Sequence, residues 1–249
     1  MSPPLHPARD GLALAADLPL EEAAALYPAL SAHVGWVKVG LSLFVEHGPA
    51  AVERFVASGA RVFLDLKLHD IPNTVQLASA RAAALGASLL TVHAQGGEAM
   101  LKAALAGVRE GAVRTGRAPP RVLAVTVLTS LVDGDLRATG HAGGAAETAA
   151  ALAALAVRSG VDGLVCSPRE AASLRAAHGP GPFLCTPGIR PAGAAALDQA
   201  RAETPAFARS AGADLLVVGR PLYTAADPVA VARALADEVL AAGAPARRG

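Results

Sequence analysis

Residues 62–71 read VFLDLKLHDI, an apolar run that ends in two carboxylates and an ammonium within a few positions. An apolar run of this kind is typical of a buried strand. Charges are rare in buried strands unless they are paired or functional. The lysines of this chain are Lys38, Lys67 and Lys102, and arginine supplies the other positive charges. A lysine kept between two aspartates therefore indicates a need for a compact ammonium that can give up a proton, which a guanidinium cannot readily do.

Similar apolar runs recur along the chain, and most of them end in a polar residue or glycine. The expected strands are residues 12–17, 36–40, 62–68, 89–94, 122–128, 163–167, 183–189 and 215–221. Alanine-rich segments with helical spacing accompany them, at residues 20–30, 49–58, 74–85, 99–110, 145–159, 168–177 and 228–240. This alternation predicts a parallel sheet, and eight such units in 249 residues predict a (β/α)8 TIM barrel. A doubly wound open sheet is the alternative, but no Gly-x-Gly-x-x-Gly turn follows the first run.

Composition limits the number of domains and the kinds of partner. With 53% hydrophobic residues, the chain is expected to form a single domain over residues 1–249, with flexible tails at 1–10 and 243–249. The net charge of +1 gives no broad basic field for nucleic acid or an anionic membrane. The N-terminus lacks the apolar core of a signal peptide, and no uninterrupted apolar run reaches spanning length. A soluble, cytoplasmic protein is expected.

The cysteines and histidines do not indicate a metal site. Cys166 and Cys185 each lie in an apolar run and are expected to be buried, inert thiols rather than a disulfide. No His, Cys, Asp or Glu set has metal-ligand spacing. His93 follows the fourth strand, where a structural histidine is the favoured interpretation and a general base the alternative.

Charged and polar residues gather where the expected strands end, which in a TIM barrel is the catalytic face. These residues are Asp17, Lys38, Asp65, Lys67, His93, Thr129, Ser167, Arg190 and Arg220. Because residues two apart in a strand share a face, Asp65 and Lys67 are expected side by side, with Lys38 within reach. Asp70 lies beyond the strand, so spacing does not give its direction. Carboxylates beside Lys67 would favour its ammonium form and make it a proton donor near a developing carbanion. An ion-pair cluster that only closes the barrel is the alternative.

The last part of the chain predicts a phosphate site. Loops after the seventh and eighth strands of TIM barrels commonly bind phosphate. Gly219 would let backbone N–H groups approach an anion, and Arg220 could bind two oxygens at once. Arg190 and Gln199 lie in residues 190–204, a glycine- and alanine-rich segment long enough to close over a bound phosphate.

The motif Asp-x-Lys-x-x-Asp-Ile-Pro-Asn-Thr at residues 65–74 resembles the signature of orotidine 5′-phosphate decarboxylases in their bacterial form. Further blocks follow the pattern of that family, namely KVG at 38–40, TVHA at 91–94, VTVLTS at 125–130, CSP at 166–168, TPGIR at 186–190, DQ at 198–199 and VVGRP at 217–221. Their order and spacing over almost the whole chain make the resemblance specific, whereas related sugar-phosphate decarboxylases share the core motif.

The resemblance implies decarboxylation of orotidine 5′-phosphate to uridine 5′-phosphate, the last step of de novo pyrimidine nucleotide synthesis, without metal or cofactor. It implies that Lys67 protonates C6 of the pyrimidine within a charged array of Lys38, Asp65, Lys67 and Asp70. It further implies that Asp17, Lys38 and Asp65 bind the substrate, with Asp17 and Lys38 at the ribose and Thr129 at the pyrimidine. The protein would be a homodimer in which Asp70, Ile71 and Thr74 come from the partner subunit.

Other interpretations remain at this stage. One is a barrel enzyme that acts on a sugar phosphate, such as a keto-acid phosphate decarboxylase or an epimerase. Those relatives generally hold a metal through extra acids, but Leu64 and Leu66 flank Asp65 and offer no further carboxylate. Another is a non-catalytic nucleotide-phosphate binding barrel, which would not need lysine at position 67. The segment after Asp17 is one residue shorter than the family pattern, so Asp10 is an alternative acid, although it is expected at the opposite barrel end.

Overall fold

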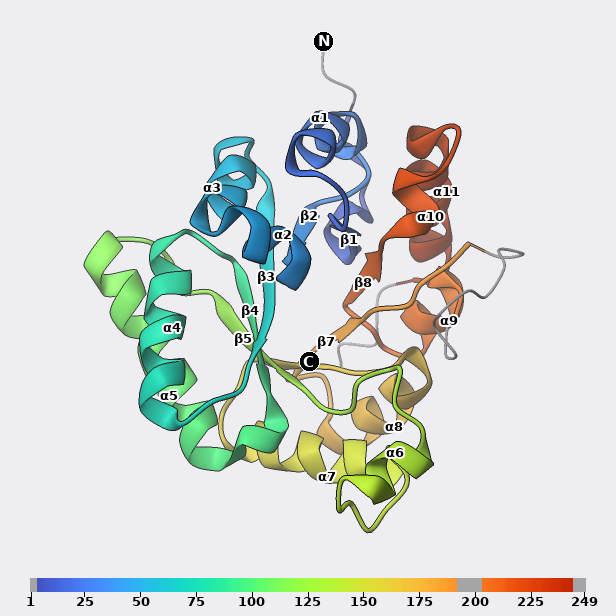
Figure 1. Ribbon diagram of the computed structural model, residues 1–249. Coiled ribbons are helices and arrows are strands. Elements are labelled where there is room, and N and C mark those ends of the chain that lie inside the picture. Colours follow the sequence, from blue (N-terminus) through green and yellow to red (C-terminus); the bar gives the residue numbers. More distant parts are fainter. Residues whose placement is uncertain (1–3, 192–202, 244–249) are drawn as a thin grey trace.

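The computed structural model describes residues 4–191 and 203–243, and it consists of a ring of parallel strands with helices on the outside (Figure 1). The strands pair in chain order and close into a barrel. They are β1 (Leu12–Ala15), β2 (Trp36–Gly40), β3 (Arg61–Leu68), β4 (Leu89–His93), β5 (Arg121–Val125), β6 (Gly163–Val165), β7 (Phe183–Thr186) and β8 (Leu215–Val218). The predicted (β/α)8 barrel is confirmed, and the doubly wound sheet is excluded.

Each helix predicted from spacing is present, and shorter ones are added. The helices are α1 (Leu20–Leu30), α2 (Leu41–His47), α3 (Pro49–Ala57), α4 (Pro72–Ala84), α5 (Gly97–Thr115), α6 (Asp133–Ala138), α7 (Ala145–Arg158), α8 (Pro168–His178), α9 (Pro205–Ser210), α10 (Arg220–Tyr223) and α11 (Pro228–Ala241). The helices α2, α6, α9 and α10 were not predicted, because they are too short to show a helical period. Most strands end earlier than their apolar runs, and residues from the ends of several runs, such as Asp17, Leu128 and Ile189, line the barrel mouth.

The core has two layers that follow from strand alternation. Inside the barrel, Phe63, Leu89, Leu123, Cys185 and other inward side chains pack together. The intervening residues, such as Leu64, Leu90 and Val92, face outward and pack under the helices. Positions Thr91 and His93 therefore share the inward face of β4 with Leu89.

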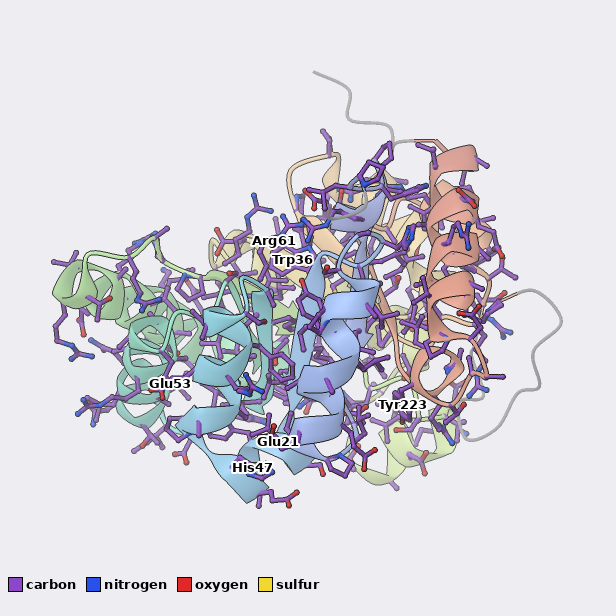
Figure 2. All side chains as sticks on the ribbon, turned by 90° about the horizontal axis from the view of Figure 1, so that it is seen from above. Glu21, Trp36, His47, Glu53, Arg61 and Tyr223 are labelled. Carbon is purple, nitrogen blue, oxygen red and sulfur yellow. The ribbon has the colours of Figure 1, made fainter. Side chains whose placement is uncertain are left out.

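The end of the barrel where the strands begin is closed by a small polar cluster. The Arg61 guanidinium lies 4.3 Å from the centre of the Trp36 ring and forms an ion pair with Asp10. The Trp36 indole donates to the Asp10 carbonyl at 3.0 Å. Trp36 and Arg61 lie together at one end of the molecule, and Tyr223, which follows β8, lies at the other (Figure 2). Asp10 is thus remote from the opposite end of the barrel, where β2 and β3 end.

The termini are described only in part. Residues 1–3 and 244–249 lie outside the described residues, so the two predicted tails stay untested there. In the described part, the N–H of His6 donates to the Ala32 carbonyl at 2.7 Å. No helix within residues 4–191 and 203–243 combines the length and the apolar character needed to cross a bilayer.

Helices α4 and α5 lie side by side on the outside of the barrel and approach very closely (Figure 1). A Cβ added at Gly107 would lie 2.2 Å from the Gln76 carbonyl oxygen, and one added at Gly111 would lie 2.2 Å from the Ala80 carbonyl oxygen. Only glycine fits at such a backbone contact. This packing fixes α4, which begins directly after the charged motif.

We predict that Gly111→Ala lowers the free energy of unfolding by about 1–3 kcal/mol, because the added methyl must push the backbones of α4 and α5 apart. Urea denaturation measures the change. Gly134→Ala in α6 is the matched control, since nothing lies within 4 Å of its added Cβ. The control is expected to keep or raise stability, by up to about 1 kcal/mol. Equal effects at the two positions would contradict the close backbone contact.

Candidate active site

Strand β3, which carries the charged motif, leaves the regular ladder at this motif. Leu64 pairs with Leu90 and Leu68 pairs with Val92, so β3 has two more residues than β4 between these pairs. Lys67 has a φ of 49°, and it is the only non-glycine residue with positive φ in the described part of the chain. Such a conformation costs roughly 1–2 kcal/mol for a residue with a Cβ, so contacts around it must hold it.

Asp65 and Lys67 do lie side by side as predicted, but simple strand alternation is not the reason. The bulge turns Lys67 back toward Asp65, and its Nζ lies 2.7 Å from Asp65 Oδ2. Lys38 Nζ, from the middle of β2, lies 3.6 Å from the same oxygen. The pairing of Asp65 with both lysines joins side chains of two neighbouring strands in one cluster.

Asp17 extends this cluster to a third strand end. Lys38 Nζ lies 3.4 Å from Asp17 Oδ1, so positive and negative groups alternate in the order Asp17, Lys38, Asp65, Lys67. Gly40 leaves room for the contact, because a Cβ there would lie 2.9 Å from Lys38 Nζ. Of the two alternative acids, the structure brings Asp17 to the lysines and places Asp10 at the opposite end of the barrel.

The carboxyl of Asp65 is buried, and two opposing effects act on its pKa. Burial raises the pKa, while the charges of Lys38 and Lys67 and the hydrogen bonds from Lys67 and Thr91 lower it. The favourable contacts prevail and hold the pKa of Asp65 below its usual value. Asp65 is therefore a carboxylate in this site, as a partner of two ammonium groups should be.

A cavity of about 470 Å³ opens over this cluster at the mouth of the barrel. Its wall includes the four charged residues, and Thr129 faces it from beyond β5. Arg190, Gly219 and Arg220 also line it, from the segments that follow β7 and β8. In the closed barrel, β7 and β8 lie on one side of β1, and β2 and β3 lie on the other. Strand β1 therefore lies between the two arginines and the two lysines. The cavity thus has a lysine–carboxylate side and an arginine side.

Backbone hydrogen bonds hold Arg190 beside the cavity. Its N–H donates to the Glu203 carbonyl at 3.1 Å, and Glu203 N–H donates to the Gly188 carbonyl at 3.3 Å. These bonds join the two ends of the glycine- and alanine-rich segment predicted to close over phosphate. Gln199 belongs to the part of that segment that lies outside the described residues.

Asp70, Ile71 and Thr74 are all exposed, and none of them is among the residues that line the cavity. The Asp70 carboxylate accepts a hydrogen bond from the Ile71 N–H at 2.6 Å. After the bulge the chain enters α4 at Pro72, and none of residues 68–74 lines the cavity. Within this subunit, the structure does not bring Asp70 into the charged cluster.

The remaining candidates have structural surroundings. Ser167 is buried and caps α8, where its hydroxyl accepts from the Arg169 N–H at 3.3 Å. Burial, with His69 and Lys67 nearby, lowers the pKa of His93 and favours its neutral form. The buried Nδ1 of His93 has no hydrogen-bond partner within residues 4–191 and 203–243.

The two thiols are buried, as predicted, and both also line the cavity. Cys166 and Cys185 are free, and burial raises the pKa of both. Within residues 4–191 and 203–243, no group of three or more His, Cys, Asp or Glu side chains could hold a metal ion.

Sequence analysis missed two residues near the site. Thr91 donates to Asp65 Oδ1 and accepts from the Lys67 N–H, both at 2.9 Å. A polar residue on the inward side of an apolar strand was the available signal. Tyr223 lines the cavity three residues after Arg220, in a helix too short to recognise.

The fold and the cavity together define a (β/α)8 barrel of the enzyme type, with charged groups at the carboxyl ends of its strands. The chain belongs to the Orotidine 5'-phosphate decarboxylase / HUMPS family, whose sequence profile matches residues 10–235. It is 58% identical over 208 residues to "Orotidine 5'-phosphate decarboxylase" of Anaeromyxobacter sp. (strain K), covering 84% of this chain and 88% of that protein. These matches confirm the resemblance noted from the motifs.

Other similar proteins cover still more of the chain. The protein of the same name from Synechococcus sp. (strain WH7803) is 52% identical over 237 residues, covering 94% of this chain and 97% of the relative. The crystal structure of orotidine 5'-phosphate decarboxylase from Lactobacillus acidophilus superposes with a TM-score of 0.81 at 37% identity, covering 92% of this chain and 99% of that one.

The lowered pKa of Asp65 predicts a pH-dependent contribution to stability. Its pKa in the folded state lies below the unfolded value of about 3.9. The ionised carboxylate therefore stabilises the fold above about pH 4, and this contribution is lost as the pH falls through the folded pKa. The difference in unfolding free energy between wild type and Asp65→Asn should shrink between about pH 5 and about pH 3 in urea titrations. A difference that stays constant would mean that Asp65 has an ordinary pKa.

Proposed function

We propose that this protein decarboxylates orotidine 5′-phosphate to uridine 5′-phosphate in pyrimidine nucleotide synthesis. Curated relatives that are more than half identical carry the name of that activity. The observation that carries the proposal is the chain of alternating charges that ends in Lys67 at the cavity. A cytoplasmic location is part of the proposal, because a nucleotide substrate is charged and does not cross membranes unaided.

The reaction needs one proton at the carbon that loses carbon dioxide. The bond between C6 and the carboxylate breaks, its electron pair stays on C6, and carbon dioxide leaves. Lys67 donates a proton from Nζ to C6, and solvent returns a proton to the amine. The ammonium also stabilises the negative charge that develops on C6. In sites of this kind, such electrostatic stabilisation usually lowers the barrier more than the proton transfer does.

Asp65 and Lys38 prepare Lys67 for this step. Asp65 Oδ2 accepts from Lys67 Nζ at 2.7 Å, which fixes the position of the donor before substrate arrives. Lys38 contributes a second positive charge 3.6 Å from the same oxygen. We propose no metal or cofactor in this step, because Lys67 supplies both the proton and the positive charge.

The rest of the cavity fits the other parts of a nucleotide. We propose that Asp17, Lys38 and Asp65 lie at the ribose and at the substrate carboxylate, which the pyrimidine carries on C6. We propose that Thr129 binds the pyrimidine ring. We assign the phosphate to Gly219, Arg220, Arg190 and Gln199. Arg190 and Arg220 support this assignment because both line the cavity on the side of β7 and β8. Gln199 rests on the family resemblance alone.

We further propose a homodimer in which Asp70, Ile71 and Thr74 complete the partner subunit's site. Their exposure and their absence from the lining of this subunit's cavity support this arrangement. Large apolar side chains in the segments that follow β2 and β3 are also exposed, with Leu41 at 53%, Val45 at 82%, Ile71 at 67% and Leu77 at 57%. Packing against another chain would remove such side chains from water.

We predict that the wild-type protein consumes orotidine 5′-phosphate in an ultraviolet absorbance assay and that excess chelator does not change the rate. Lys67→Ala should lose at least about 10³-fold in kcat, because it removes the proton donor and its charge together. Binding of uridine 5′-phosphate, measured by calorimetry, should persist in that variant. Loss of turnover in chelator would favour a metal-dependent sugar-phosphate enzyme, and an unchanged rate in Lys67→Ala would exclude its role.

A subunit-mixing experiment tests the split site. Homodimers of Lys67→Ala and of Asp70→Asn should each be nearly inactive, because every site lacks one group. After exchange, a mixed dimer has one site with intact Lys67 from one chain and intact Asp70 from the other, so activity should return. Exchange is checked with two affinity tags. No recovery after demonstrated exchange would mean that Asp70 acts within its own subunit.

A further inference from the structure

We propose that Thr91 is a positioning residue whose hydroxyl holds Asp65 and Lys67 in the geometry needed for proton transfer. This inference rests on the decarboxylase function proposed above. It concerns a side chain of β4 that lines no part of the cavity and therefore acts only through its neighbours.

The hydroxyl of Thr91 joins two parts of the bulge. Lys67 N–H donates to Thr91 Oγ1 at 2.9 Å, and Thr91 Oγ1 donates to Asp65 Oδ1 at 2.9 Å. A hydroxyl has a single proton, so a group that accepts from the amide and faces a carboxylate must direct that proton to the carboxylate. Thr91 is fully buried, so bulk water does not reach its hydroxyl in the folded state.

The first of these bonds supports an unfavourable backbone conformation. The bulge removes Lys67 from the regular ladder between β3 and β4, and its φ of 49° lies in the left-handed region. If the Lys67 N–H had no hydrogen-bond partner, the cost of an unsatisfied donor would add to the cost of the left-handed conformation. The Thr91 hydroxyl takes the place of the missing strand carbonyl, so the conformation of Lys67 depends on it.

The second bond fixes the plane of the Asp65 carboxylate. Oδ1 accepts from Thr91, which leaves Oδ2 for Lys67 Nζ at 2.7 Å and Lys38 Nζ at 3.6 Å. Without the bond to Oδ1, the carboxylate could rotate and carry both ammonium groups with it. Because displacements of about 1 Å can cost about 100-fold in rate, such a rotation would reduce catalysis more than binding.

A role in packing alone predicts a different residue. Thr91 lies on the inward face of β4, where its neighbours Phe63, Leu89 and Leu123 are apolar. Valine has nearly the same shape and would fill this space without a buried hydroxyl. The hydroxyl is therefore the part of Thr91 that the charged cluster requires.

The test compares Thr91→Val, which keeps the shape, with Thr91→Ser, which keeps the hydroxyl. For Thr91→Val we expect kcat for orotidine 5′-phosphate to fall about 10- to 100-fold. KM, and the Kd for uridine 5′-phosphate, should change less than about 3-fold, since the groups that bind nucleotide remain. Thr91→Ser should stay within about 5-fold of wild-type kcat, because its hydroxyl can make both bonds.

Several results would overturn the proposal. Wild-type kcat in Thr91→Val would show that the hydroxyl is dispensable, and equal losses in the valine and serine variants would show that only shape matters. If Thr91→Val does not fold, Thr91→Ala replaces it, and alanine and serine variants with equal kcat would overturn the role. A wild-type protein that does not consume orotidine 5′-phosphate would overturn the proposed function and this inference together, whereas the results above overturn only the role of Thr91.

Discussion

The buried carboxylate of Asp65, placed between two lysines, is the contact on which the rest of the site depends. A carboxylate taken out of water is costly unless opposite charges and hydrogen bonds surround it. Lys38, Lys67 and Thr91 supply those contacts from three neighbouring strands. The two ammonium groups in turn tolerate each other's proximity only because Asp65 lies between them. Removing any one charge takes a partner from at least one of the others, so the charges are coupled in energetic terms.

The bulge in β3 connects this cluster to the surface of the molecule. By inserting extra residues opposite β4, it turns Lys67 inward and sends the next residues outward into α4. A short segment thereby faces two directions, with Asp65 and Lys67 at the cavity and Asp70 and Ile71 exposed. Local strain at a site of this kind persists only where the surroundings hold it, and here β4 contributes the Thr91 hydroxyl, which accepts from the Lys67 N–H.

The sequence was sufficient for the barrel and for bringing four charged residues to its mouth, and particular residues show where it stopped. The strands and the long helices follow from apolar periodicity, and Asp17, Lys38, Asp65 and Lys67 follow from their place at strand ends. The left-handed conformation of Lys67 could not be predicted, because it depends on the register with β4, which local spacing does not contain. For the same reason the contacts of Thr91 with Asp65 and Lys67 could not be predicted, although Thr91 begins the family block at residues 91–94. Helices α2, α6, α9 and α10 were too short for a period to develop.

The close contact of α4 with α5 has a consequence for assembly. Gly107 and Gly111 let the two backbones touch, and α4 begins one residue after the exposed Ile71. The segment that carries Asp70 and Ile71 is thus anchored at both ends, by the bulge on one side and by a tightly packed helix on the other. A chain that packs against it meets a surface already in its final shape. In the proposed homodimer, association would then lose little conformational entropy, which would leave more of the contact free energy to hold the two subunits together.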